Sequence, residues 1–202
     1  MTWLLAAALL CLSLGNLAHA AEAMTGTAEP GNNPSLTLER SDGSVLMSAH
    51  FGFDLPPVVE DALYKGIPIY FVAQADLLRE RWYWTNKTIA SVQRKLRLSY
   101  HPLTRRWRLT MGDGDMTEAT QGLTLGQSFD RLDDAMAAVR RVSRWKIANE
   151  QDIDPSGKYL VVFSFELDTS QLPRPLQIGT LGQSDWVIDV RISQALDPER
   201  TK

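Results

Sequence analysis

Apolar and polar residues alternate along most of the chain, which is the pattern of half-buried β-strands. Every second residue is apolar in 67–77 and again in 159–167, and the first half of 67–78 is apolar on both faces, as in a central strand. Shorter alternating segments are 36–38, 45–53, 89–100, 105–111 and 186–192. We therefore expect about six to nine strands, most of them joined by short turns such as Asp42-Gly43.

Two segments carry helix signals instead. The first begins at Pro56-Pro57 and ends at Gly66, with proline in the first turn and glycine after the last. The second, Asp130 to Ser143, has apolar residues spaced by three and four, acids at its start, and Arg140, Arg141 and Arg144 at its end. Because helices do not alternate with strands, we predict an antiparallel β-sandwich, immunoglobulin-like in general form, with two short inserted helices.

The N-terminus has the features of a secretory signal peptide. Trp3 to Leu14 is apolar but too short to remain as a membrane span, and Ala18-His19-Ala20 supplies small residues for cleavage. The only cysteine, Cys11, lies inside this run, so the processed chain forms no disulfide. We expect a signal peptide at 1–20 cleaved near Ala20, a flexible leader at 21–34, one domain at 35–193, a polar tail at 194–202, and a periplasmic location.

Positive charge is concentrated in the segment 79–108. It holds nine Lys or Arg against one acid, Glu80, while the whole chain has a net charge of −3. In a hairpin turning at 101–104, Lys95, Arg97, Arg106 and Arg108 point outward on one face, with like charges opposite each other. Stability does not favour that arrangement, so the cations indicate a surface for an anionic partner.

Aromatic residues stand next to these cations. Trp82 and Trp84 flank Tyr83, close to Arg79 and Arg81. They are either large side chains that plug the core or part of an aromatic-basic binding surface. The candidate binding residues are Lys95, Arg97, Arg106, Arg108, Trp82, Trp84, Arg79 and Arg81.

The expected export decides between the partners of such a surface. Nucleic acid would be the usual one, but an exported protein does not meet it. An envelope or membrane-associated protein with an acidic face, or anionic lipid headgroups, remain. The oligomeric state does not follow from the pattern.

Catalytic chemistry has little support in the sequence. The histidines after the signal segment are His50 and His101, and nucleophile, phosphate-loop and zinc-protease motifs are missing. Asp113 with Asp115, and Asp152 with Asp154, have calcium-like spacing but do not continue as a twelve-residue loop. We expect no cofactor and no metal, and a non-enzymatic binding or accessory module. The alternative is a hydrolase acting on an envelope polymer through unidentified carboxylates, because such acids meet only in the fold.

Three long stretches resemble a known family. They are ALYKGIPIYFVAQADLLRERWYW (62–84), RLSYHPLTRRWRL (97–109) and LDTSQLPRPLQIGTLGQSDW (167–186). They are similar to the proteobacterial domain of unknown function 4390 family, over roughly residues 36–192. The resemblance implies an exported, periplasmic protein and supplies no catalytic or binding residues.

Overall fold

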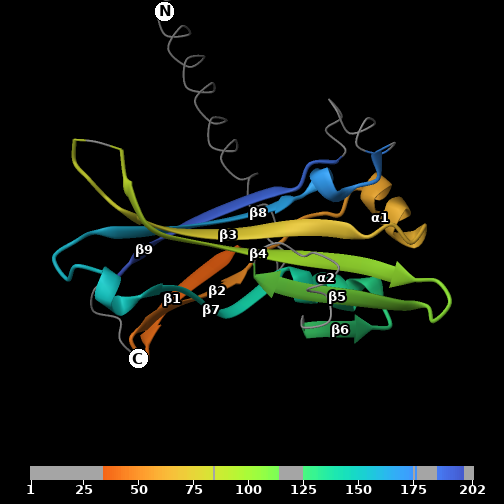
Figure 1. The fold of residues 1–202 in the computed structure, drawn as a ribbon, viewed down its shortest axis with the longest axis horizontal. Helices are drawn as coiled ribbons and strands as arrows, with labels where there is room; N and C mark the ends of the chain where they lie inside the picture. The colour runs from red at the N-terminus through yellow and green to blue at the C-terminus, as the bar shows by residue number, and fades with distance from the viewer. Residues whose placement is uncertain (1–33, 84, 114–124, 175, 177–185, 198–202) are drawn as a thin grey trace, which may run out of the picture. The chain divides into compact units, whose positions relative to one another are not determined.

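The computed structural model describes residues 34–83, 85–113, 125–174, 176 and 186–197 of the chain. Within these ranges the strands form two antiparallel sheets, one in the order β1-β2-β7 and one in the order β6-β5-β4-β3-β8-β9 (Figure 1). The predicted signal peptide, and the leader up to Asn33, lie outside the described residues. None of the helices within the described ranges is long and apolar enough to cross a membrane.

Within the described ranges, seven of the nine strands overlap the alternating segments, whereas β6 and β7 do not. The strands are β1 (Ser35–Ser41), β2 (Ser44–His50), β3 (Ile69–Arg79), β4 (Lys87–His101), β5 (Arg106–Asp113), β6 (Leu125–Phe129), β7 (Arg141–Asn149), β8 (Tyr159–Leu167) and β9 (Asp189–Leu196). The helices are α1 (Pro57–Tyr64) and α2 (Leu132–Val139), with short 3-10 turns η1 (Glu150–Asp152) and η2 (Thr169–Gln171).

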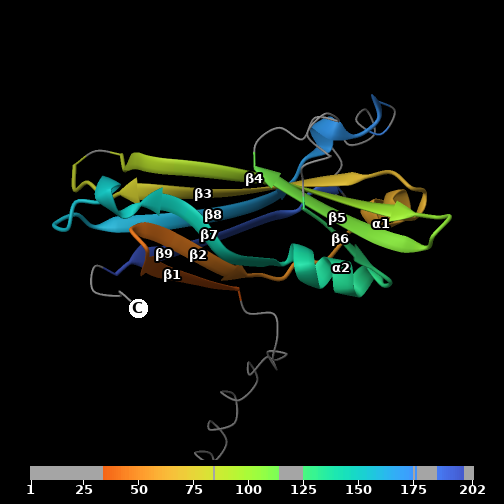
Figure 2. The same cartoon turned by 60° about the horizontal axis from the view of Figure 1, so that its bottom comes forward.

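The two sheets share one hydrophobic core. β3 and β8, paired at the centre of the larger sheet, both bury every second side chain. Those side chains join one cluster with Val45, Met47 and Phe51 from β2 and the segment after it. Figure 2 shows β1, β2 and β7 against one face of the larger sheet, with β1 next to β9 and β7 next to β3 and β4. The predicted fold class is confirmed: the chain is mainly β, with two antiparallel sheets in a sandwich-like arrangement and two helices.

Local signals placed the first hairpin and the first helix correctly. Asp42 and Gly43 have φ values of 53° and 67°, so this turn is the left-handed type that suits a two-residue hairpin. Helix α1 ends before Gly66, whose φ of 80° favours glycine.

The predicted helix from Asp130 to Ser143 is too long. Helix α2 occupies only Leu132–Val139, and the chain then enters β7, which pairs with β2. The arginines assigned to the last helical turn lie at or beyond its end, and Arg144 has a φ of 45° where the β2–β7 pairing shifts register. Pairing with β2 buries Trp145 and Ile147, which outweighs the local helix signal.

The predicted register of the β4–β5 hairpin is wrong by two residues. His101 pairs with Arg106, so the connection is 102–105 rather than 101–104. Arg97 then lies opposite Thr110, and Arg108 lies opposite Ser99, so like charges are not directly opposed.

The last strand, β9, extends to Leu196, which is buried and belongs to the sheet rather than to a polar tail.

Candidate functional site

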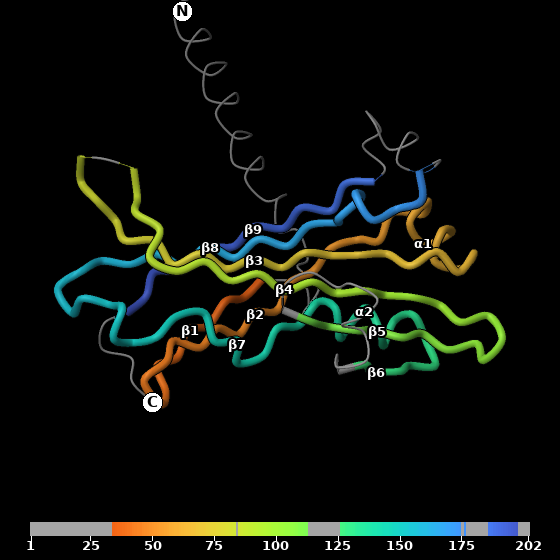
Figure 3. Tube along the Cα trace, in the orientation of Figure 1, coloured from red at the N-terminus to blue at the C-terminus, as the bar shows by residue number. Residues whose placement is uncertain are grey.

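The seven candidate binding residues that the structure describes do not form one surface. β4 has 15 residues, and at about 3.3 Å per residue its ends are roughly 46 Å apart. Arg79 pairs with Lys87 at one end, whereas His101 pairs with Arg106 at the other. Arg81 and Trp82 therefore lie at the end away from Arg106, and Figure 3 shows the two hairpin connections at opposite ends of β4. Trp84 lies outside the described residues.

Lys95, Arg97, Arg106 and Arg108 do share the outer face of the larger sheet, as predicted. Arg97, Arg106 and Arg108 contact neighbouring side chains or backbone as follows, and Lys95 is not free either. Arg106 donates to Oδ1 of Asp130 from both Nε (3.0 Å) and Nη2 (2.9 Å). The Arg97 guanidinium lies 6.0 Å from the centre of the Tyr70 ring. The Arg108 side chain covers Gly126 of β6, so closely that a Cβ there would lie 3.3 Å from Arg108 Nε.

The hairpin connection between β3 and β4 is much more exposed. Trp82 is 92 % exposed and Tyr83 is 65 % exposed, so Trp82 is not a core side chain. Their rings meet edge to face, with centroids 4.7 Å apart. Arg81, Lys87 and Lys158 are exposed around them, and none of the three forms an ion pair with another described residue. We call these five residues, Arg81, Trp82, Tyr83, Lys87 and Lys158, the aromatic-basic tip.

A carboxylate holds the base of this tip in place. Arg79 Nη2 donates to Asp154 Oδ2 at 2.9 Å, which joins the end of β3 to the connection between β7 and β8. The backbone N–H and hydroxyl of Ser156 donate to Asp154 Oδ1 at 3.0 and 2.8 Å. The Asp154 backbone N–H in turn donates to the Tyr159 hydroxyl at 2.8 Å.

A backbone hydrogen bond completes the base. Glu80 N donates to the carbonyl oxygen of Lys158 at 2.9 Å, so the hairpin and Lys158 are held side by side. Between them lies an open concavity of about 970 Å³, lined by Arg79–Tyr83, Asn86 and Ser156–Lys158. Sequence reasoning missed Lys158, since only the pairing of β3 with β8, which sets Arg79 opposite Tyr159, brings it beside Glu80.

A family model described as Domain of unknown function (DUF4390) matches residues 29–195. The chain belongs to this family. The match confirms the resemblance seen in the sequence, and its range includes both Trp82 and Lys158, so the tip lies within the DUF4390 domain. No curated protein and no solved structure matches the chain.

The hydrogen bonds of Asp154 in this DUF4390 domain predict how it titrates. The two bonds from Ser156 are the main reason that the pKa of Asp154 is lowered from 3.8, and the charge of Arg79 adds to the effect. A carboxyl group with a lowered folded-state pKa stabilises the fold above its unfolded-state pKa, and this contribution is lost as pH falls through the folded-state pKa. The Arg79–Asp154 contact is therefore expected to persist in mildly acidic solution.

Carbon NMR titration of the Asp154 carboxyl group tests this expectation. Its midpoint should lie below the ordinary aspartate value, and Ser156→Ala should move it upward because the hydroxyl donor is lost. A midpoint at or above the ordinary value in the unmodified protein would contradict the hydrogen-bonded geometry.

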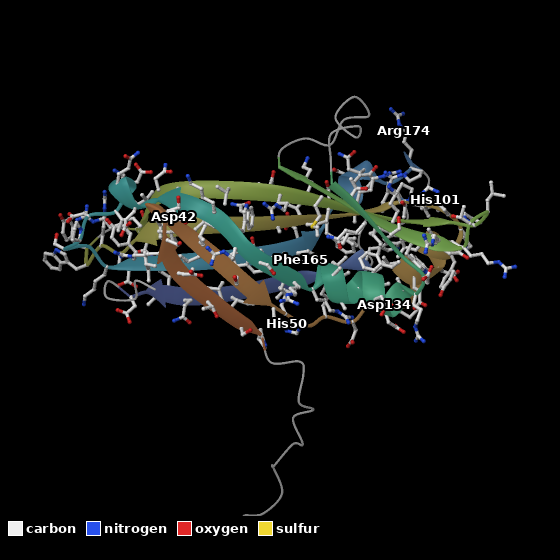
Figure 4. All side chains as sticks on the ribbon, turned by 90° about the horizontal axis from the view of Figure 1, so that it is seen from below. Asp42, His50, His101, Asp134, Phe165 and Arg174 are labelled. Carbon is white, nitrogen blue, oxygen red and sulfur yellow. The ribbon has the colours of Figure 1, made fainter. Side chains whose placement is uncertain are left out.

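In the described part of the DUF4390 domain, the concavity at the tip, a cleft beside Leu36–Leu38 and a cleft along Ser143–Asn149 contain one carboxylate each, and a cleft beside α2 contains none. Glu166 and Asp189 are paired across β8 and β9, but both are exposed and neither lines these clefts. His50 and His101 lie far apart (Figure 4). In the part of the chain that the structure describes, no group of His, Cys, Asp and Glu could hold a metal ion.

Proposed function

We propose that this DUF4390 protein is an exported, non-enzymatic binding module that docks through its aromatic-basic tip onto an acidic protein or an anionic component of the cell envelope. The observation that carries the proposal is the exposure of Trp82, at 92 %, among cations that form no ion pair with another described residue. Export rests on the apolar run and cleavage pattern of residues 1–20.

The tip combines an exposed tryptophan with a tyrosine and an arginine, which are the residue types found most often in binding hot spots. Trp, Tyr and Arg are the residue types that contribute most when interfaces form, because they combine a large apolar area with a polar group. In this chain the aromatic pair lies outside the core, while its base is fixed by the Asp154 and Glu80 hydrogen bonds. The base of the tip is therefore held in place, which reduces the backbone entropy that is lost on binding.

The outer-face cations are the weaker candidate for docking. Arg106 is already neutralised by Asp130 at 2.9 Å, and Arg97 is half-buried against Tyr70. Ser99 and Thr110, on the same face, are each only 5 % exposed. A partner would thus gain less new contact here than at the tip.

A matched pair of double variants tests the proposal. Arg81→Glu with Lys158→Glu reverses two cations at the tip, and Arg105→Glu with Arg108→Glu reverses two exposed cations near the other end of β4. Both variants change the net charge equally. In affinity capture from crosslinked envelopes, we expect the tip variant to recover at least about tenfold less of the bound component, because each cation near an anionic surface contributes about 1 kcal/mol.

The control variant should capture as the unmodified protein does, and added salt should release the component from the unmodified protein. Thermal unfolding must show that both variants remain folded. Equal capture by all three proteins would overturn the proposal, and loss only in the Arg105/Arg108 variant would move the docking surface to the outer face.

A further inference from the structure

The aromatic pair at the tip has the chemistry of a membrane-interface anchor. Tryptophan and tyrosine concentrate at the boundary between lipid headgroups and acyl chains, where an apolar ring and a polar N–H or O–H are both accommodated. Trp82 is 92 % exposed, next to Tyr83 at 65 %. At the other end of β4, Leu103 is 101 % exposed but aliphatic, and the ring of Tyr64, which is 51 % exposed, packs against Tyr100 and Trp107.

The shape of the tip favours a lipid surface over a protein partner. The connection between Arg79 and Lys87 projects past the paired strands in Figures 1 and 3, and the connection between β7 and β8, which carries Lys158, lies at the same end of the fold. Stable protein interfaces bury about 800 Å² on each partner over a broad, complementary patch. A bilayer interface needs no complementary shape, so a projecting hairpin that carries two exposed aromatic rings can enter it.

The cations around the rings suit anionic headgroups. Arg81, Lys87 and Lys158 are exposed and unpaired among the described residues. The concavity of about 970 Å³ beside them also contains the carboxylate of Glu80 and the hydroxyl of Ser156. Basic residues outnumber this single acid, so the local charge attracts phosphate groups, and long basic side chains can reach them while the rings insert.

We propose that the aromatic-basic tip binds the surface of an anionic phospholipid bilayer, with Trp82 and Tyr83 in the headgroup region and Arg81, Lys87 and Lys158 against the lipid phosphates. This inference rests on the proposed function, because it names the partner of the same tip. In this arrangement one end of the larger sheet contacts the membrane, and the β4–β5 hairpin at the other end points away from the membrane.

Vesicle sedimentation tests the inference. The protein is recovered from the cells that make it, so that its N-terminal segment is in its natural form, and is mixed with phosphatidylcholine vesicles with or without phosphatidylglycerol. We expect binding to the anionic vesicles only, weakened by salt. Trp82→Ala should lower the partition coefficient about tenfold, and Arg81→Gln and Lys158→Gln about fivefold each. The emission of the unmodified protein should shift to shorter wavelength on binding, and that of the Trp82→Phe variant much less.

Leu103→Ala and Arg105→Gln are the matched controls, since both residues are exposed at the opposite hairpin. These variants should bind as the unmodified protein does. The inference is overturned by an absence of binding to anionic vesicles, or by equal losses in the controls and the tip variants. If vesicles are not bound but the tip variant still loses its captured component, the partner is a protein and only the lipid inference fails. If capture is also unchanged, both proposals fail.

Discussion

Phe165→Ala is expected to lower the free energy of unfolding by about 3–5 kcal/mol, the usual cost of removing a fully buried phenyl group. Phe165 is 0 % exposed and lies near the middle of the structure (Figure 4). Its ring centroid is 4.8 Å from that of Phe51, 5.3 Å from that of Phe71 and 5.4 Å from that of Phe53. These rings connect the centre of the larger sheet to the segment that follows β2, so the cavity would weaken the contact between the sheets.

Urea unfolding of the two proteins measures this loss. Leu103→Ala is the matched control, because Leu103 is 101 % exposed and its truncation should change the free energy by no more than about 0.5 kcal/mol. Phe165→Leu should cost less than the alanine variant, since it leaves a smaller cavity. A loss below about 1 kcal/mol for Phe165→Ala would show that the two sheets do not share this aromatic cluster.

The strands were predictable because their side chains repeat every second residue. β3 and β8 each bury one complete face, and that face is visible directly in the sequence. The order of the strands was not predictable, because β8 pairs with β3 across 79 intervening residues and β7 pairs with β2 across 90. Nothing local to these segments encodes their partners.

The length of α2 shows how a local signal misleads. Arginines after the helix resembled a favourable C-terminal charge pattern, so the predicted helix ran through Ser143. In the structure residues 141–143 are the start of β7, whose Trp145 and Ile147 enter the core. Tertiary burial decides the outcome where the helix signal is a few charged residues.

The candidate site was only half predictable for a related reason. The excess of cations in 79–108 is a property of the sequence, but a 15-residue strand separates its two ends. Counting charge along the chain therefore merged two distant surfaces. The tip was visible as an aromatic cluster near arginines, whereas Lys158 joins it only through the antiparallel pairing of β3 with β8.

Arg94 interrupts the apolar face of β4, and the structure gives this residue a role. It pairs with Ala73 of β3 and Asp113 of β5, and it lines two clefts that lie between β4 and β7. Its guanidinium carbon lies 4.8 Å from the centre of the Trp145 ring, which is the distance of a cation–π contact. The arginine thus connects β4 of the larger sheet to β7 of the smaller one.

Trp145→Ala is therefore expected to cost about 3–5 kcal/mol, because it opens a cavity and removes the aromatic face beneath a half-buried charge. Arg94→Met keeps the stem and removes the charge, so it should cost less. The unfolding free energies of both single variants and the double variant separate the energy of the Arg94–Trp145 contact from the cost of the cavity. We expect a coupling energy between the two residues of about 0.5–2 kcal/mol. Single losses that simply add would mean that the arginine and the tryptophan stabilise the fold independently. The arginine would then act through its other contacts, and the bridge between β4 and β7 would rest on the packing of Trp145 alone.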